Sequence, residues 1–259
     1  MNSPAPTNPT PTTLPDALRT LGLRRAAADL DDLIARATKA RWSATQLLEE
    51  LVRAEQHDRA RRSLERRLRR SHIGRFKTAA DFDWNWPKKI DRRAVERALA
   101  LDFLDGPKNV IFIANQGLGK TMLAQNIAHN AILAGRSALF TTAAQVLLDL
   151  GAQDSSRALE RRLRHYVKPE VLCLDEVGYL SYDARAADLL FQVVSRRYEH
   201  KAIVLTTNLV FRDWPSVFPN ASCTTALIDR LVHHAEIIKM DGDSFRRREA
   251  EHAKQAAAD

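Results

Sequence analysis

Short apolar runs alternate with longer segments of helical composition along the carboxy-terminal two thirds of the chain. Each run has the length and composition of a buried strand, and two of the runs end in polar residues. The pattern therefore predicts a succession of strands and helices. The expected strands are 110–113, 137–141, 171–176, 202–208 and 237–240, and the expected helices are 122–134, 143–150, 158–166 and 226–231.

The amino-terminal third has a helical pattern instead. Asp16 is a candidate cap for a short helix that ends at Gly22, and residues 23–40 are expected to form a second helix. Ser43 followed by Gln46 is a capping-box pattern, which opens a long helix. That helix carries apolar residues on roughly one stripe, namely Leu47, Leu48, Leu51, Val52, Leu64 and Leu68.

The stretch NVIFIANQGLGKT at 109–121 places a glycine-containing turn between an expected strand and an expected helix. Backbone N–H groups that point at phosphate oxygens require small residues and unusual backbone angles, which Gly117 and Gly119 supply. The helix that follows favours an anion at its N-terminus. Lys120 can reach the β- and γ-phosphates, and the Thr121 hydroxyl can ligate Mg²⁺. The pattern predicts a P-loop for ATP, with Asn115, Gln116, Gly117, Leu118, Gly119, Lys120 and Thr121 as the binding residues.

One position departs from the pattern GxxxxGK[ST], because Ala114 stands where the pattern has glycine. If this position needs a positive φ, alanine costs roughly 1–2 kcal/mol, and its methyl group would crowd the nucleotide. Two alternatives follow, namely a Gly-Lys-Thr that occurs by chance and a degenerate loop that binds nucleotide poorly. The strand before the loop and the helix after it argue against chance.

Polar residues follow two of the apolar runs. Asp175 and Glu176 fit the end of a buried parallel strand that delivers carboxylates at its carboxyl end. In P-loop ATPases the first acid helps to hold Mg²⁺, and the second can polarise the attacking water. Asn208 is expected to hold that water or the γ-phosphate, although asparagine is also common in turns at strand ends.

A single arginine on the expected helix 226–231 has two interpretations. Arg230 forms a surface ion pair with Asp229, or it is an arginine finger aimed at the ATP of a neighbouring subunit. Such fingers contribute about 10³–10⁵ in rate and are often supplied in trans. The second interpretation requires a neighbouring copy of the chain.

A formal net charge of +8 and a pI near 9.8 suggest an anionic partner, and nucleic acid is the first candidate. Basic residues crowd the second half of the long amino-terminal helix, where Asp58 and Glu65 are the nearby acids. Either acids elsewhere neutralise this helix, or it forms a row of phosphate contacts, which give affinity for many duplexes without sequence choice. The candidate contacts to double-stranded DNA are Arg59, Arg62, Arg66, Arg67, Arg69 and Arg70, with Arg161 and Arg162 in a second basic cluster where both interpretations are equally open.

Cysteine use and hydropathy indicate a cytoplasmic protein. Cys173 and Cys223 form no CxxC pattern, which suggests free thiols in a reducing compartment. No apolar run approaches the length of a membrane span, so no membrane partner is expected. The first residues lack the basic and apolar regions of a signal peptide.

These patterns divide the chain into five segments. The first is rich in Pro, Thr and Asn, which cannot support a core. The third segment begins with an aromatic stretch that is expected to be extended. Either its aromatic side chains join the helical domain to the next domain, or Phe76 or Phe82 packs beside an adenine. The segments are a disordered tail at 1–15, a helical basic domain at 16–75, a connector at 76–108 with a helix at 91–103, an ATPase core at 109–248 and a frayed tail at 249–259.

The order of these motifs resembles a known family. The chain is similar to IstB-type transposase helper ATPases, of the AAA+ clade that includes DnaC-type helicase loaders, from about residue 13 to about residue 250. The long carboxy-terminal matches are more specific than the P-loop. The matching segments are GLGKTMLA at 117–124, RHYVKPEVLCLDEVGYL at 164–180, ADLLFQVVSRRYE at 187–199, TTN at 206–208, DWPSVFPNA at 213–221, ALIDRLVHHAEII at 226–238 and GDSFR at 242–246, together with the basic amino-terminal helix and a KT-x₃-FDW connector.

The resemblance implies an AAA+ core, with a parallel five-stranded αβα sheet, behind a small all-helical domain. It implies ATP-dependent homo-oligomerisation on duplex DNA, recruitment and stimulation of an IstA-type transposase, and an influence on target choice. The family usually has Gly-Pro where this chain has Ala114-Asn115, which bears on nucleotide affinity or turnover and not on the fold. By position, Lys120 and Thr121 take the Walker A roles, Asp175 and Glu176 the Walker B roles, Asn208 becomes sensor 1, Arg230 the finger, and Arg246 a candidate for sensor 2.

Two rival functions remain open at this point. A helicase loader shares the ATPase parts and differs in its partner, so an adjacent transposase gene would favour the transposition function. A DNA-binding scaffold that has lost turnover through Ala114 would differ in its ATPase activity with and without duplex DNA.

Overall fold

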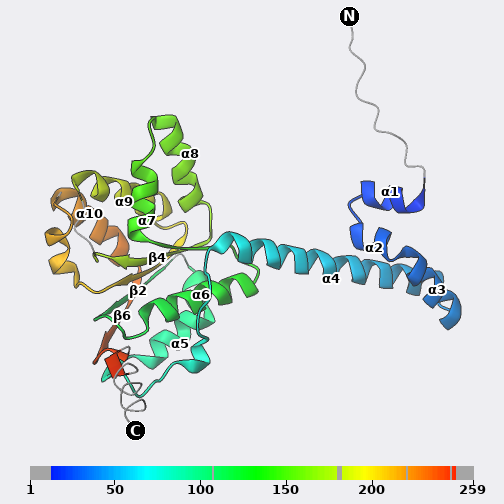
Figure 1. Ribbon diagram of the computed structural model, residues 1–259, viewed down its shortest axis with the longest axis horizontal. Coiled ribbons are helices and arrows are strands. Elements are labelled where there is room, and N and C mark those ends of the chain that lie inside the picture. The colour runs from blue at the N-terminus through cyan, green and yellow to red at the C-terminus, as the bar shows by residue number, and fades with distance from the viewer. Residues whose placement is uncertain (1–12, 107, 180–182, 220, 246, 249–259) are drawn as a thin grey trace, which may run out of the picture. The chain divides into compact units, whose positions relative to one another are not determined.

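The computed structural model describes residues 13–106, 108–179, 183–219, 221–245 and 247–248 (Figure 1). The chain divides into two compact units, Met1–Arg66 and Arg67–Asp259. The tail expected at 249–259, most of the tail expected at 1–15, and Arg246 lie outside the described residues.

The first unit consists of helices: α1 (Leu14–Thr20), α2 (Arg24–Ala28), α3 (Leu30–Ala40) and the first part of α4 (Ala44–Ser71). The capping box is confirmed, because the Ser43 hydroxyl accepts from the Gln46 N–H and the Gln46 side chain accepts from the Ser43 N–H. The cap assigned to Asp16 is wrong, since Thr13 caps α1. The single helix expected over 23–40 is also wrong, because Asp29 separates α2 from α3.

The apolar stripe on α4 is only partly covered. Leu48 and Val52 are 60% and 50% exposed, whereas Leu47 and Leu51 are half-buried. The buried residues of the first unit include small side chains of α2 and two carboxylates of α4, Glu55 and Asp58. Hydrogen bonds from the backbone N–H groups of Arg25 and Ala26 to the Glu55 carboxylate therefore join α2 to α4 where apolar packing was expected.

The second unit is built on a six-stranded sheet in the order β1-β6-β2-β5-β4-β3. Neighbouring strands from β6 to β3 pair in parallel, as expected, while β1 is a short antiparallel strand at the edge that the sequence did not predict. The strands are β1 (Lys89–Ile90), β2 (Asn109–Ala114), β3 (Ala138–Thr142), β4 (Val171–Val177), β5 (Ala202–Thr207) and β6 (Ala235–Asp241).

Helices cover both faces of this sheet. In Figure 1, α5 and α6 lie together, and α7, α8, α9 and α10 gather on the other side of the strands. Alternate residues of β4 follow this division, because the Cys173 thiol lies 3.8 Å from the Ala124 carbonyl oxygen on α6, while Leu172 and Leu174 belong to the core shared with α7, α9 and α10. The helices are α5 (Arg92–Ala100), α6 (Lys120–Leu133), α7 (Ala143–Gly151), α8 (Ser156–Val167), α9 (Ala184–Arg197) and α10 (Ala221–Val232).

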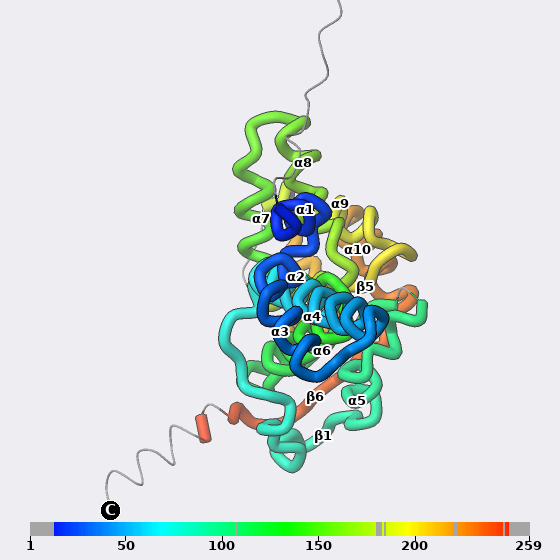
Figure 2. Tube along the Cα trace, turned by 90° about the vertical axis from the view of Figure 1, so that its right-hand side faces the viewer, coloured from blue at the N-terminus to red at the C-terminus, as the bar shows by residue number. Residues whose placement is uncertain are grey.

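Three short 3₁₀ turns complete the unit, at Ala79–Asp81, Asp102–Leu104 and Phe211–Ser216. The α7–α8 pair stands side by side at the top of Figure 2. No helix in the described part of the chain is long and apolar enough to cross a membrane.

A fully buried arginine at the end of α9 joins several backbone segments. The Arg197 guanidinium donates to the carbonyl oxygens of Tyr166 and Val167, at the carboxyl end of α8, at 2.9 and 3.2 Å. It also donates to Pro169, Glu170 and Ala202 carbonyl oxygens at 2.8, 3.1 and 2.6 Å. One side chain thus satisfies carbonyl groups from α8, from the loop before β4 and from β5.

Candidate nucleotide-binding site

The expected P-loop joins the end of β2 to the start of α6. Gly117 and Gly119 have φ values of +79° and +86°, which other residues rarely adopt. A side chain would also lack space there, since a Cβ atom on Gly119 would lie 2.7 Å from Cε2 of Phe82. Both glycines are required by backbone angle and by space.

The alanine that departs from the P-loop pattern does not need a glycine conformation. Ala114 is the last residue of β2 and pairs with Met240 of β6. It is absent from the positive-φ residues, and it lines neither of the two cavities beside the loop. The strain considered for this position is therefore not present in the loop.

Lys120 begins α6 and turns its ammonium group back to the loop. Its Nζ donates to the carbonyl oxygens of Ala114 and Asn115 at 2.7 and 2.8 Å. The positive charge of Lys120 therefore lies beside the loop, where it would contact a bound anion.

A cavity of about 640 Å³ opens on one side of the loop. Phe82 and Trp86 from the segment before β1, and Phe245 after β6, contribute aromatic side chains to its lining. The expectation of a fully extended connector is wrong, because Thr78 and Asp81 form a capping box around a 3₁₀ turn. Of the two candidates for contact with adenine, Phe82 lines this cavity, whereas Phe76 packs against the His129 ring of α6, 5.3 Å between centroids.

The segment after β6 closes this cavity from the carboxy-terminal side. The Phe245 N–H donates to the Gly117 carbonyl oxygen at 3.0 Å. The Trp86 indole N–H donates to the Asp243 carbonyl oxygen at 2.8 Å, and the Arg248 guanidinium lies 4.7 Å from the Trp86 ring centroid. The P-loop is thus held between segments that lie far apart in the sequence.

The first of the two acids is buried at the carboxyl end of β4. Asp175 is 4% exposed, and its Oδ1 accepts from the hydroxyl groups of Thr121, at 3.1 Å, and Thr206. Carboxylate and hydroxyl oxygens are ligands that Mg²⁺ prefers, so this pair fits the ion. Thr206 was not among the residues expected from the sequence; its place directly before Thr207-Asn208 at a strand end was the available signal.

The second acid, Glu176, is exposed, unlike Asp175. Glu176 has φ +58° and lies at a register shift of the β4–β5 pairing, and its N–H donates to the Thr206 hydroxyl at 3.0 Å. Such bulges re-aim side chains beside active sites. A second cavity of about 160 Å³ is lined by Gln116, Gly117, Lys120, Thr121, Glu176, Tyr179, Thr206, Thr207 and Asn208. The structure therefore brings Lys120, Thr121, Glu176 and Asn208 together.

Arg230 does not join this group within its own chain. Its guanidinium lies 4.4 Å from the Phe191 ring centroid and donates to the Ser195 hydroxyl, both on α9. Neither cavity includes it among its lining residues. Among the described residues, no ion pair joins it to Asp229, so the first interpretation of this residue is wrong.

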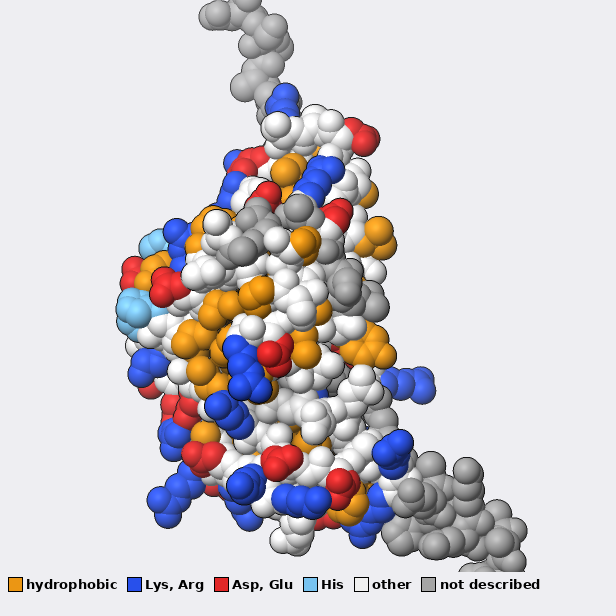
Figure 3. All heavy atoms as spheres, turned by 90° about the vertical axis from the view of Figure 1, so that its left-hand side faces the viewer, with side chains coloured by type: hydrophobic (Ala, Val, Ile, Leu, Met, Phe, Trp, Pro, Cys, Tyr) orange, Lys and Arg blue, Asp and Glu red, His pale blue; other side chains and the backbone are white. Residues whose placement is uncertain are grey.

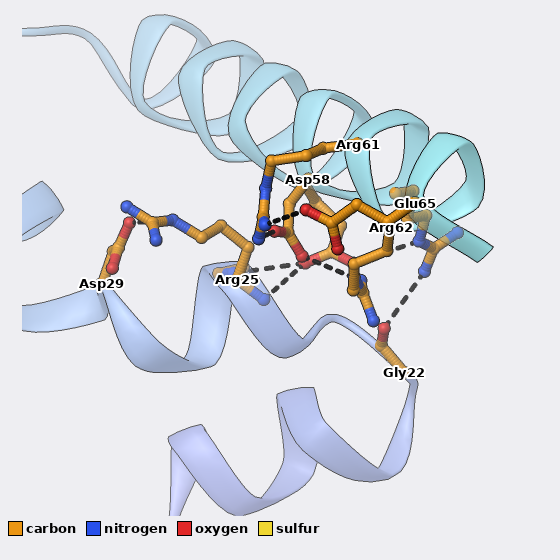
Figure 4. Close-up of polar contacts among 10 residues, drawn as sticks. Gly22, Arg25, Asp29, Asp58, Arg61, Arg62 and Glu65 are labelled. Carbon is orange, nitrogen blue, oxygen red and sulfur yellow. Dashed lines mark hydrogen bonds and ion pairs between the residues drawn. The ribbon is translucent and has the colours of Figure 1, made fainter. Parts of the chain in front are cut away.

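The candidate DNA contacts on α4 fall into two groups. Figure 4 shows Arg62, a member of the first group, beside Asp58. Arg59 and Arg62 pair with the buried carboxylate of Glu55, and Arg62 also pairs with Asp58. Burial raises the pKa of Glu55, but N–H donors of Ala26 and Arg25 and the Arg59 guanidinium outweigh burial and lower it overall. Of the two interpretations of this helix, neutralisation by acids therefore applies to these two arginines, because Glu55 pairs with both and Asp58 pairs with Arg62.

The remaining arginines of α4 differ from this group. Arg67 donates to the Ile132 carbonyl oxygen at 3.3 Å. Arg66, Arg69 and Arg70 are exposed and form no ion pair with any described residue. In the second cluster, Arg161 is exposed, while Arg162 is paired with Asp149.

Comparison with known proteins supports the sequence resemblance. The family model described as IstB-like ATP binding protein matches residues 16–253. The chain is 38% identical over 207 residues to the ATP-binding protein of insertion sequence IS5376 from Geobacillus stearothermophilus, covering 80% of this chain and 82% of that protein. It is 32% identical over 232 residues to the ATP-binding protein of insertion sequence IS21 from Pseudomonas aeruginosa, covering 90% and 88%.

A solved structure supports the fold. The crystal structure of DnaI superposes with a TM-score of 0.52 at 21% identity, covering 66% of this chain and 91% of that chain. Together with the strand order, this likeness confirms the expected AAA+ fold, and at this identity it concerns the fold alone.

Proposed function

This chain belongs to the family of IstB-like ATP-binding proteins, and on that premise we propose that it is an ATP-dependent, DNA-binding regulator of transposition. The observation that supports this most is the convergence of Lys120, Thr121, Asp175, Glu176 and Asn208 around one loop. Asp175, Glu176 and Asn208 lie at the carboxyl ends of the adjacent parallel strands β4 and β5, and Lys120 and Thr121 begin the helix that follows β2. Ligands bind at such strand ends in open α/β sheets.

The nucleotide would occupy both cavities beside the P-loop. Lys120 and the N–H groups of the loop would bind the phosphates, and the aromatic cavity with Phe82, Trp86 and Phe245 would hold the adenine. Thr121 and Asp175 would hold Mg²⁺, which when bound neutralises charge on the phosphate oxygens. The bridging contacts of Trp86 and Phe245 keep this base pocket in contact with the loop.

Glu176 would orient and polarise the attacking water, with Asn208 beside it. Glu176 is exposed, lines the small cavity together with Lys120, and is held through its backbone N–H by the Thr206 hydroxyl. We expect Glu176→Gln to bind ATP normally and to lower the hydrolysis rate about 10²-fold or more, because general-base catalysis contributes about 10²–10⁴-fold. A phosphate-release assay with parallel ATP titration measures both effects.

The matched control for this variant is Glu96→Gln, which neutralises an exposed acid paired with Arg92 on α5. Its hydrolysis rate should equal that of the wild type. Normal turnover in Glu176→Gln would remove Glu176 from the proposed role.

Three arginines of α4 would provide the phosphate contacts with duplex DNA. Arg66, Arg69 and Arg70 are the members of the expected row that are exposed and not paired with an acid among the described residues. Removing one phosphate contact should reduce the slope of log K against log salt by about 0.9. We expect the triple change to glutamine to lower the slope by about 2–3, measured by fluorescence anisotropy across a salt series.

A charge-matched control separates direct phosphate binding from net charge. Changing Arg36, Arg53 and Arg61 to glutamine removes the same charge from residues that are each paired with an acid. This control should change the slope much less than the first triple variant does. Equal slopes in the two triple variants would show that Arg66, Arg69 and Arg70 do not make the phosphate contacts.

A neighbouring subunit and a transposase complete the proposal. Because Arg230 lies outside the cavities of its own chain, it would act in trans, which requires a homo-oligomer. The relatives are named for insertion sequences, so an IstA-type transposase is the partner that we propose.

Titration of a fluorescent ATP analogue, with and without duplex DNA, tests the whole proposal. Tighter binding of the analogue in the presence of DNA is expected, because the two ligands favour the same assembly. No binding under either condition would overturn the proposal. Binding with DNA-dependent assembly but without hydrolysis would favour the scaffold that has lost turnover.

A further inference from the structure

Two histidines and a glutamate lie together on the second unit, away from the nucleotide-binding residues. Glu199 follows the end of α9, and His233 and His234 form the connection between α10 and β6. Their ligand atoms, one from each residue, all lie within 4.8 Å of one another. We call these three residues the Glu199–His233–His234 cluster. Figure 3 shows histidine side chains next to acidic ones at the edge of one face of the molecule.

The two imidazole rings converge although they belong to consecutive residues. Their centroids are 3.9 Å apart, and both rings are exposed. The His234 Nε2 lies 3.6 Å from the Glu199 Oε1. Three potential ligand atoms this close together, from two separate connections, can be brought around one ion by rotation of their side chains.

The backbone beneath the cluster is fixed on both sides. The His233 N–H donates to the Asp229 carbonyl oxygen at 3.0 Å, in the last turn of α10, and the His234 carbonyl oxygen accepts from the Asn109 N–H of β2 at 2.7 Å. On the other side, Tyr198 is tied to Val194 by a backbone hydrogen bond of 2.8 Å. The ligands can therefore adjust by rotating side chains, with little movement of the backbone.

A tyrosine supports one of the histidines as a partner of a metal ligand does. The Tyr198 hydroxyl lies 2.5 Å from Nδ1 of His233, and its ring stacks with both imidazoles. If Nδ1 carries the proton, His233 donates to the Tyr198 oxygen and leaves the lone pair of Nε2 available. Metal-bound histidines usually donate their other ring N–H to such a partner, which fixes the tautomer.

We propose that the Glu199–His233–His234 cluster binds a divalent transition-metal ion, with Zn²⁺ as the preferred ion. Two imidazole nitrogens and one carboxylate oxygen are a common ligand set for Zn²⁺, with bonds of about 2.0–2.2 Å and a tetrahedral arrangement. Mg²⁺ requires oxygen ligands in an octahedron and does not fit. The fourth position is left for water or for a ligand from another molecule.

Binding would connect the end of α9 to the start of β6. Arg230 of α10 already contacts Phe191 and Ser195 of α9, and an ion at the cluster would add a connection beyond the carboxyl ends of the same two helices. This site needs neither ATP nor DNA, so its test is independent of the proposed function.

Isothermal titration of the untagged full chain with ZnCl₂, after removal of metals by EDTA, tests the proposal. One equivalent of Zn²⁺ should bind, and an equal concentration of Mg²⁺ should not compete. His234→Ala and Glu199→Gln should each weaken binding at least about tenfold, and Tyr198→Phe about 10–100-fold, as loss of a supporting partner does. Zn²⁺ should also raise the unfolding temperature of the wild type and not that of the ligand variants.

The matched control is His200→Ala, which removes an exposed histidine next to the cluster that is not one of its members. Its affinity for Zn²⁺ should equal that of the wild type. Unchanged affinity in His234→Ala and Glu199→Gln, or an equal loss in His200→Ala, would overturn the proposal, because the ion would then be held by other side chains.

Discussion

Lys120→Ala is expected to reduce ATP affinity by at least about 100-fold and to abolish ATP-dependent assembly. The ammonium group would lose charge-assisted bonds to the phosphates, each worth about 1.5–3 kcal/mol, and 1.4 kcal/mol corresponds to a factor of ten in affinity. In the structure, Nζ lies between two loop carbonyl oxygens, at 2.7 and 2.8 Å, so the charge is already positioned over the loop. Fluorescent-nucleotide titration measures the affinity, and light scattering measures assembly.

A second lysine makes a matched control for this variant. The Nζ of Lys201 also donates to two backbone carbonyl oxygens, those of Val167 and Lys168, at 3.0 and 2.6 Å. It lines neither cavity, so Lys201→Ala should leave nucleotide affinity unchanged. Wild-type affinity in Lys120→Ala would refute the P-loop assignment.

Arg197→Ala should have the largest effect on stability. It would leave five buried or partly buried carbonyl oxygens without the guanidinium that binds them. Leaving buried groups unsatisfied costs about 1–3 kcal/mol each before relaxation, so we expect a loss of roughly 3–5 kcal/mol in unfolding free energy. For a unit of this size that loss lowers the unfolding temperature by at least about 6 °C, which calorimetry measures.

The neighbouring arginine is the control. Arg196 is half-exposed and pairs with Glu160 on α8. Exposed ion pairs contribute about 0–1 kcal/mol, so Arg196→Ala should change the unfolding temperature little. Equal effects of the two variants would mean that the bonds of Arg197 do not hold α8 and β5 together.

The residues at the strand ends could be predicted because the fold type determines where they meet. Once the sequence indicates parallel strands, the carboxyl ends of β2, β4 and β5 must share an edge of the sheet, which places Lys120, Asp175 and Asn208 together. The aromatic pocket could not be predicted in the same way. Phe82 and Phe245 lie near opposite ends of the sequence of the second unit. No pattern in either segment indicates that both side chains line the cavity beside the same loop.

Charge counting along one helix failed for a related reason. A window of residues on α4 shows which charges are near in sequence, but it does not show that Glu55 is buried against α2 and draws in Arg59 and Arg62. A buried carboxylate is costly unless donors pair with it. Glu55 lies outside that window of residues, and it pairs with Arg59 and Arg62, two of the candidates for contact with DNA. In the same way, the apolar stripe on α4 did not indicate that Leu48 and Val52 would remain exposed.

The position of β2 in the sheet determines when the site can exist during synthesis. Its two neighbours, β5 and β6, are both made later, and Phe245 closes onto Gly117 only after the last strand. When the P-loop has just emerged from the ribosome, β2 therefore has neither of the two strands that pair with it in the sheet. We therefore expect a nascent chain to bind nucleotide only after nearly the whole protein has emerged, and truncated translation products to bind none.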